Sequence, residues 1–140
     1  MTKAEYEKLA AFRYELRRFL RFSEQEAKRQ GVAGIQYLAL LAIEGFPGRD
    51  RITIGELAER LHIAAHTAVG LADRLEVAGL ARRGSADGDR RQVHLTLTPQ
   101  GRARLETLAA VHQQELQSSG PALVHELSRL LDAPCLESAL

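Results

Sequence analysis

The stretch TIGELAERLHIAAHTAVGLADRLEVAGLARRGSADGDRRQVHLTLTPQG, residues 53–101, contains two short runs of apolar residues at helical spacing and then an alternating run. The spacing predicts one helix from about Gly55 to Leu61 and a second from near Ala65, ended by Gly79, a residue type favoured just past a helix. The apolar positions are Leu57, Ala58 and Leu61 in the first helix and Ala68, Leu71, Ala72 and Leu75 in the second. Because both faces would bury against one core, the pair is predicted to be a helix-turn-helix.

The outer face of the second helix remains free for a partner. It presents small and hydrogen-bonding residues, namely His66, Thr67, Val69, Gly70, Asp73 and Arg74. A helix of this kind can enter the major groove of DNA, where its N-terminal residues meet base edges. The residues that we expect to contact DNA from this helix are His66, Thr67, Val69, Gly70 and Arg74.

A β-hairpin is predicted after Gly79, with strands at Leu80–Arg83 and Gln92–Thr98. In the second strand, Val93, Leu95 and Leu97 alternate with Gln92, His94 and Thr96. The residues with turn chemistry between the strands are Gly84, Ser85, Asp87, Gly88 and Asp89. A hairpin directly after a helix-turn-helix predicts a wing.

The predicted wing is rich in arginine. Its four arginines are Arg82, Arg83, Arg90 and Arg91, and Asp87 and Asp89 lie between them. An arginine oriented by a carboxylate can enter a narrow minor groove, where the potential is most negative. We therefore expect Arg83, Arg90 and Arg91 to contact DNA, with Asp89 as the orienting group. The alternative is a solvated hairpin whose charges only keep the chain soluble.

Four motifs resemble the MarR family of bacterial transcription regulators. They are LAERL at Leu57–Leu61, DRLEVAGL at Asp73–Leu80, DRR at Asp89–Arg91 and LTPQG at Leu97–Gly101. The resemblance extends over about residues 5–132, because the family also places long helices before and after the DNA-binding core. It implies a mainly α-helical winged helix-turn-helix with a small β-hairpin wing and long terminal dimerisation helices.

The resemblance also implies roles for single residues. The wing arginine of the family falls on Arg91 and its orienting aspartate on Asp89, while the groove-reading positions fall on His66, Thr67, Val69 and Gly70. Many members have a hydroxyl residue at the start of the recognition helix and a polar or basic residue near position 70. This chain has Ala64, Ala65 and Gly70, so fewer hydrogen bonds to bases are available. Since such regulators often occlude promoters, the resemblance implies a repressor.

Long helices are predicted on both sides of this core. The first runs from about Lys3 to Arg29 and stops at Gly31; its apolar face is formed by Leu9, Phe12, Leu16, Phe19 and Leu20. The C-terminal helix opens with Thr98 as N-cap and Pro99 in the first turn, and we expect a break at Gly120–Pro121 before a last helix at about Ala122–Leu131.

These terminal helices have apolar faces that a small winged core does not cover, and a symmetric dimer would bury them. Two recognition helices would then meet half-sites roughly 10 bp apart on a near-palindrome. We expect one domain over residues 1–140. Its parts would be a DNA-binding core at residues 32–101, dimerisation helices at residues 1–30 and 102–132, and a tail at residues 133–140.

A small aromatic or anionic effector is a further expectation, since family members often bind one between the dimer helices and the DNA-binding lobes. All seven aromatic residues precede residue 47. The expected effector-binding residues are Arg17, Phe19, Phe22 and Tyr37. Arg13, Arg17 and Arg21 form a basic stripe able to hold a carboxylate. The alternative is core packing for the aromatic residues and a solvated face for the arginines.

Composition agrees with one globular domain: 45% of residues are hydrophobic, 26% are charged and the net charge is +1. Positive charge is concentrated in residues 1–30 and 55–105, and residues 106–140 are net acidic. There is no apolar run of membrane length and no signal peptide, so we expect a cytoplasmic protein. Cys135 is the only cysteine, which allows no internal disulfide, and a redox role for it is a minor alternative.

Catalytic and metal chemistry have little support in the sequence. His112 and Glu115 have a spacing that metal sites use, but no third ligand can be assigned, and His62 and His66 straddle the turn. There is no paired-carboxylate, phosphate-loop or nucleophile motif. We expect no enzyme, no metal and no cofactor; the alternative to DNA binding is a winged-helix module that binds another protein.

Overall fold

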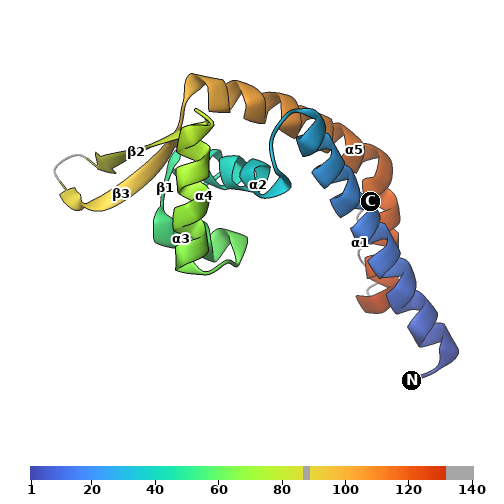
Figure 1. Ribbon diagram of the computed structural model, residues 1–140. Helices are drawn as coiled ribbons and strands as arrows, with labels where there is room; N and C mark the ends of the chain where they lie inside the picture. Colours follow the sequence, from blue (N-terminus) through green and yellow to red (C-terminus); the bar gives the residue numbers. More distant parts are fainter. Residues whose placement is uncertain (87–88, 132–140) are drawn as a thin grey trace. The chain divides into compact units, whose positions relative to one another are not determined.

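The computed structural model describes residues 1–86 and 89–131, with only the backbone for residues 86 and 89–92. The elements in chain order are α1 (Lys3–Arg29), α2 (Gly34–Glu44), β1 (Arg51–Thr53), α3 (Ile54–Leu61), α4 (Ala65–Val77), β2 (Ala81–Ala86), β3 (Asp89–Leu97) and α5 (Pro99–Leu131) (Figure 1). The fold is mainly α-helical with one small sheet, as predicted. It divides into two compact units, residues 27–109 and residues 1–26 together with those from 110 onward.

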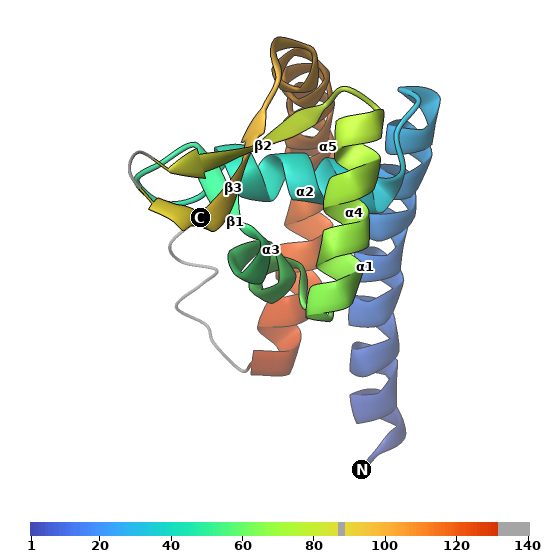
Figure 2. The same cartoon turned by 60° about the vertical axis from the view of Figure 1, so that its left-hand side comes forward.

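The unit of residues 27–109 is built on an antiparallel sheet with strand order β1-β3-β2. Ile52 on β1 faces Leu95 on β3, and Ala81 on β2 faces Leu97 on β3. α2 and α4 contact the sheet, and α3 contacts both of these helices. α3 and α4 lie side by side, next to the sheet (Figure 2). The largest fully buried side chains of this unit are Leu40, Ile43, Ile52, Leu57, Leu71, Leu75, Leu95 and Leu108.

Residues 34–44 and 51–53 form α2 and β1, for which no element is predicted from the sequence. α2 reads GIQYLALLAIE and has almost no polar face, so its apolar residues show no helical period. Leu40 and Ile43 are buried on one side of α2. Leu38 and Leu41 lie on another side and are more than 40% exposed. β1 has three residues, which is too short for an alternating pattern.

The hairpin is longer at its tip than predicted. β2 extends to Ala86 instead of Arg83, and β3 begins at Asp89 instead of Gln92. Burial on β3 also differs from simple alternation, because Val93 is 42% exposed whereas His94 is buried at 5% exposure. His94 pairs with Gly84 on β2, which has no side chain to project beside the imidazole ring. The tip at residues 87–88 lies outside the described residues.

In the other unit, α1 packs against α5 through a small aromatic cluster. The imidazole of His112 hydrogen-bonds to the Ser23 hydroxyl at 2.8 Å. The rings of Phe19 and Phe22 approach it edge-on, with centroid separations of 6.2 Å and 5.6 Å. α1 has the predicted bounds, and Gly31 follows it with a positive φ of 81°, a conformation in which glycine carries no Cβ penalty.

The predicted break at Gly120–Pro121 is wrong, because α5 is continuous from Pro99 to Leu131 with Pro121 inside it. A proline usually ends a helix because it lacks an N–H and because its ring clashes with the preceding residue. Part of that clash involves the preceding Cβ, which Gly120 does not have. The helix therefore continues with one backbone hydrogen bond missing.

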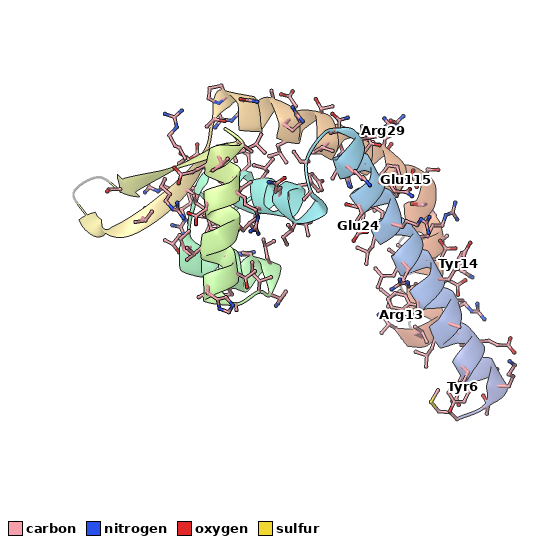
Figure 3. All side chains as sticks on the ribbon, in the orientation of Figure 1. Tyr6, Arg13, Tyr14, Glu24, Arg29 and Glu115 are labelled. Atoms are coloured by element: carbon pink, nitrogen blue, oxygen red, sulfur yellow. The ribbon has the colours of Figure 1, made fainter. Side chains whose placement is uncertain are left out.

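Large apolar side chains remain exposed on both helices of this unit. They are Tyr6, Leu9, Tyr14 and Leu20 on α1, and Leu116, Val124, Leu127 and Leu131 on α5. Tyr6 and Tyr14 are labelled on α1 in Figure 3. Large contiguous apolar patches are rare on monomeric soluble proteins, and these side chains are the ones that a partner of this unit would cover. None of the described helices is both long and apolar enough to span a membrane.

Candidate nucleic-acid interface

The first helix of the pair, α3, is fixed at its N-terminus by a capping box. The Thr53 hydroxyl accepts a hydrogen bond from the Glu56 backbone N–H at 3.1 Å, and the Glu56 carboxylate accepts one from the Thr53 N–H at 2.9 Å. Arg49 donates to the same carboxylate. The pKa of Glu56 is lowered. Desolvation alone would raise it, but the hydrogen bonds from Thr53 and the charge of Arg49 favour the carboxylate more strongly. Glu56 is therefore held as a carboxylate.

The turn between the helices starts at His62, the C-cap of α3. His62 adopts a left-handed conformation with φ 54° and ψ 47°, which few residues other than glycine adopt but in which asparagine, aspartate and histidine are enriched. The α4 helix then begins after Ala64, whose side chain makes no capping hydrogen bond. The first backbone N–H groups of α4 thus lack a side-chain acceptor at the cap, because alanine has no polar side-chain atom.

The second helix, α4, buries the predicted face. Ala68, Leu71, Ala72 and Leu75 are fully buried. On the outer face, His66, Thr67, Val69, Asp73 and Arg74 are exposed and Gly70 is half-buried. The structure thus brings the five helix residues expected at DNA onto one accessible side of α4.

Gly70 and Arg74 are neighbours on this face. A Cβ atom placed on Gly70 would lie 3.6 Å from a guanidinium nitrogen of Arg74, which is ordinary contact distance. The Arg74 side chain therefore lies along the helix over Gly70. The missing side chain at position 70 thus leaves room for the Arg74 guanidinium on this face of α4.

Arg83 on β2 contacts α4. Its guanidinium donates to the Glu76 carboxylate at 2.6 Å and to the Val69 carbonyl at 3.4 Å, and it forms an ion pair with Asp73 at 2.7 Å. The Arg83 backbone N–H also donates to Glu76, at 3.3 Å. Hydrogen bonding to Asp73, followed by that to Glu76, raises the pKa of Arg83 despite some desolvation.

The wing arginines thus differ in their surroundings. Arg82 is exposed, whereas Arg83 is half-buried. The side chains of Asp89, Arg90 and Arg91 lie outside the described residues, although their backbone belongs to β3. The predicted orientation of Arg91 by Asp89 therefore remains a prediction.

The junction of the wing with α5 explains the motif LTPQG. The Thr98 hydroxyl accepts from the Gly101 N–H at 3.0 Å and donates to the Gly79 carbonyl at 2.6 Å. Thr98 therefore caps α5, as predicted, and also holds the end of α4. A Cβ on Gly101 would lie 1.8 Å from the Leu80 carbonyl oxygen, so this position requires glycine.

The expected effector residues belong to both compact units. Tyr37 is buried in the core of residues 27–109. Phe19 and Phe22 contact His112 in the other unit. Arg17 is exposed and lines a groove of about 790 Å³ with Tyr14, Arg18, Leu20, Arg21, Glu24 and Gln25. The groove is basic and partly apolar, a combination suited to an aromatic anion.

A metal site has no support among the described residues, in which no three His, Cys, Asp or Glu side chains are grouped to hold an ion. His112 instead lies in the aromatic cluster and hydrogen-bonds to Ser23. Cys135 lies outside the described residues.

Comparison with known proteins agrees with this architecture. Residues 30–92 match the sequence model of the MarR family. No match was found among the curated proteins. The fold is similar to that of AbsC, a MarR family transcriptional regulator from Streptomyces coelicolor, with a TM-score of 0.77 and 22% identity over 99% of this chain and 96% of that one.

Two further solved structures are similar along most of the chain. A variant of MepR from S. aureus, bound to an oligodeoxyribonucleotide, has a TM-score of 0.66 and 20% identity over 91% of this chain and 92% of that one. BpsR from Bordetella bronchiseptica, whose DNA binding is regulated by 6-hydroxynicotinic acid, has a TM-score of 0.63 and 25% identity over 86% of this chain and 90% of that one. Residues 30–92 are thus a MarR-family winged helix-turn-helix, set in a chain that has the fold of MarR-family regulators throughout.

Proposed function

We propose that the protein is a homodimeric transcription regulator that binds a near-palindromic operator in double-stranded DNA and represses the promoter it occupies. The observation that carries the proposal is the exposed face of α4 in a winged helix-turn-helix. The family match over residues 30–92 supports it, as does the oligodeoxyribonucleotide bound to the MepR variant of similar fold. The protein would act in the cytoplasm, without a cofactor or a catalytic step.

In this proposal the recognition helix reads bases in the major groove. His66 and Thr67, in the first turn of α4, would hydrogen-bond to base edges, and Val69 would contact a thymine methyl group. Gly70 would permit close approach of the helix, and Arg74 would contact a base or phosphate beside it. With few donors on α4, DNA shape read by the wing would add to specificity.

The wing is proposed to contact the minor groove through Arg90 and Arg91, with Asp89 holding the Arg91 guanidinium. Arg91→Ala should weaken binding to every duplex sequence. It should also lower the slope of log K against log salt by about one unit, because one arginine that neutralises the DNA backbone is lost. Asp89→Ala should produce the same change to a smaller extent. Arg129→Ala, which removes an exposed arginine from α5, is the control and should leave the slope unchanged.

Base reading is tested separately from charge. Alanine substitution of His66 or Thr67 should change which bases are preferred at fixed salt, with little effect on the salt slope. An unchanged preference in both variants would mean that these residues do not read sequence. Failure of the wild-type protein to bind any duplex, together with a protein partner that nuclease does not release, would favour the protein-interaction module.

We also propose a small aromatic or anionic effector that releases the DNA. The basic groove containing Arg17 and Arg21 supports an anion, and BpsR offers a parallel in the aromatic acid that regulates its DNA binding. Phenolic and pyridine carboxylic acids should raise the melting temperature of the wild-type protein more than that of Arg17→Gln. No stabilisation by any of these acids would remove the support for this part of the proposal.

A further inference from the structure

Three groups on α4 converge on one side chain of the wing. Val69, Asp73 and Glu76 are spaced at i, i+4 and i+7 and therefore form one stripe along the helix. The Arg83 guanidinium spans this stripe, contacting the Val69 carbonyl and both carboxylates. Glu76 additionally accepts from the Arg83 backbone N–H, so both the side chain and the main chain of β2 are tied to α4.

We propose that Arg83 is a positioning residue that holds the wing against the recognition helix, and that its charge serves Asp73 and Glu76 rather than a DNA phosphate. This inference rests on the proposed DNA-binding function. It reassigns Arg83 from the set of direct DNA contacts expected from the sequence, and it leaves that role to Arg90 and Arg91.

Electrostatics give a reason for such a contact. Asp73 lies on the outer face of α4 with its side chain 59% exposed, and Glu76 lies beside it. Two uncompensated carboxylates next to the proposed DNA face would repel phosphates. The Arg83 guanidinium offsets part of this charge by bridging the two carboxylates, with one terminal nitrogen on Asp73 and the other on Glu76, a geometry that the single ammonium nitrogen of lysine does not supply.

Geometry gives a second reason. Arg83 lies between the start of β2 at Ala81 and the hairpin tip, where Arg90 and Arg91 follow in the sequence. A change in the angle of the hairpin at Arg83 would displace the tip by more than it displaces the base. Fixing the hairpin at this residue therefore fixes how far the tip lies from the helix that reads the major groove.

Arg82 provides a matched control. It is the adjacent arginine of the same strand, and neighbouring strand residues point to opposite faces of the sheet. Arg82 is exposed and pairs with Thr96 on β3. Arg82→Gln and Arg83→Gln thus remove the same charge one residue apart, and only the second removes the contact with α4.

The experiment compares hydrogen exchange of the β2 and β3 amides, without DNA, in the wild-type protein, Arg83→Gln, Arg83→Lys, Asp73→Asn and Arg82→Gln. The proposal predicts exchange about tenfold faster in Arg83→Gln and Asp73→Asn, a smaller increase in Arg83→Lys and none in Arg82→Gln. Exchange as slow in Arg83→Gln as in the wild type would overturn the proposal. This arm does not depend on DNA, so it stays decisive if the proposed function fails.

The second arm measures binding to a selected duplex and to a random duplex over a range of salt. Arg83→Gln and Asp73→Asn should both reduce the preference for the selected duplex about tenfold, and the salt slope of Arg83→Gln on random DNA should remain that of the wild type. A slope lower by about one unit in Arg83→Gln would instead identify a direct phosphate contact. An unchanged preference for the selected duplex in both Arg83→Gln and Asp73→Asn would also contradict the proposal, because the wing would then read DNA equally well without this contact.

Discussion

At the scale of single residues, the structure identifies positions where one atom decides the local backbone. The Leu80 carbonyl lies so close to Gly101 that an added Cβ would be 1.8 Å from its oxygen. The backbone at this junction also carries the Thr98 hydroxyl contacts to Gly79 and Gly101. A change at Gly101 must therefore displace the start of α5 or the end of α4.

We expect Gly101→Ala to lower the free energy of unfolding by about 3 kcal/mol, because either backbone segment must move. Urea denaturation followed by circular dichroism measures this change. Gly55→Ala is the matched control: its Cβ would meet only the Thr53 hydroxyl oxygen, at 4.0 Å. The steric explanation fails if Gly101→Ala is as stable as Gly55→Ala.

Glu56 predicts a pH dependence of stability. Its pKa is lowered from the usual 4.5, so the native state favours the carboxylate, and the resulting stability is present above pH 4.5 and is lost as the pH falls through the folded-state pKa. Glu56→Gln should be about 0.5–1 kcal/mol less stable at pH 7, and the difference should shrink below pH 4. Urea titrations at several pH values measure it, with the exposed Glu59→Gln as control. A difference that is constant with pH would contradict the assigned charge.

At the scale of elements, sequence pattern predicts those that have one buried face. α1, α3 and α4 appear at the predicted places because their apolar residues recur at helical spacing. α2 has no such contrast, since Ile35, Leu38 and Leu41 are exposed although apolar. A pattern of apolar residues cannot separate a buried helix from a buried strand when every face is apolar.

The contact of Arg83 with α4 illustrates what sequence could not predict at the candidate site. The exposed face of α4 follows from residue spacing alone. The contact of Arg83 with Asp73 and Glu76 depends on how β2 packs against α4, and the same arginine is equally consistent with a DNA contact when only the sequence is read. By contrast, the capping box at Thr53 and Glu56 has a local signature, a hydroxyl residue followed three residues later by Glu.

The continuity of α5 yields a prediction for Pro121. Pro121→Ala restores one backbone N–H to the helix and should raise the free energy of unfolding by about 1–3 kcal/mol. Thermal melts followed by circular dichroism measure this effect. If Pro121 is tolerated because Gly120 lacks a Cβ, Gly120→Ala should destabilise the protein when Pro121 is present and stabilise it when Ala replaces Pro121. The same sign in both backgrounds would refute that explanation.

At the scale of the whole molecule, the proposed dimer would cover the exposed apolar residues of α1 and α5 with a second copy of the chain. Light scattering after size exclusion should give twice the chain mass of 15.5 kDa. Leu20→Glu, at a position 51% exposed on α1, should shift the population toward monomer, because it places a charge in the proposed interface. Val77→Glu, at a position 90% exposed on α4, should leave the mass unchanged. A monomeric wild-type protein would contradict the dimer.

A net charge of +1 means that binding must depend on local arginines more than on overall attraction. Sequence-specific DNA binding is tested by selecting bound duplexes from a random pool with the purified wild-type protein at about physiological salt and sequencing them. We expect enrichment of a near-palindrome whose half-sites are about one helical turn apart. Salt-sensitive binding without any enriched sequence would contradict this expectation, because the α4 face would then contribute no base recognition.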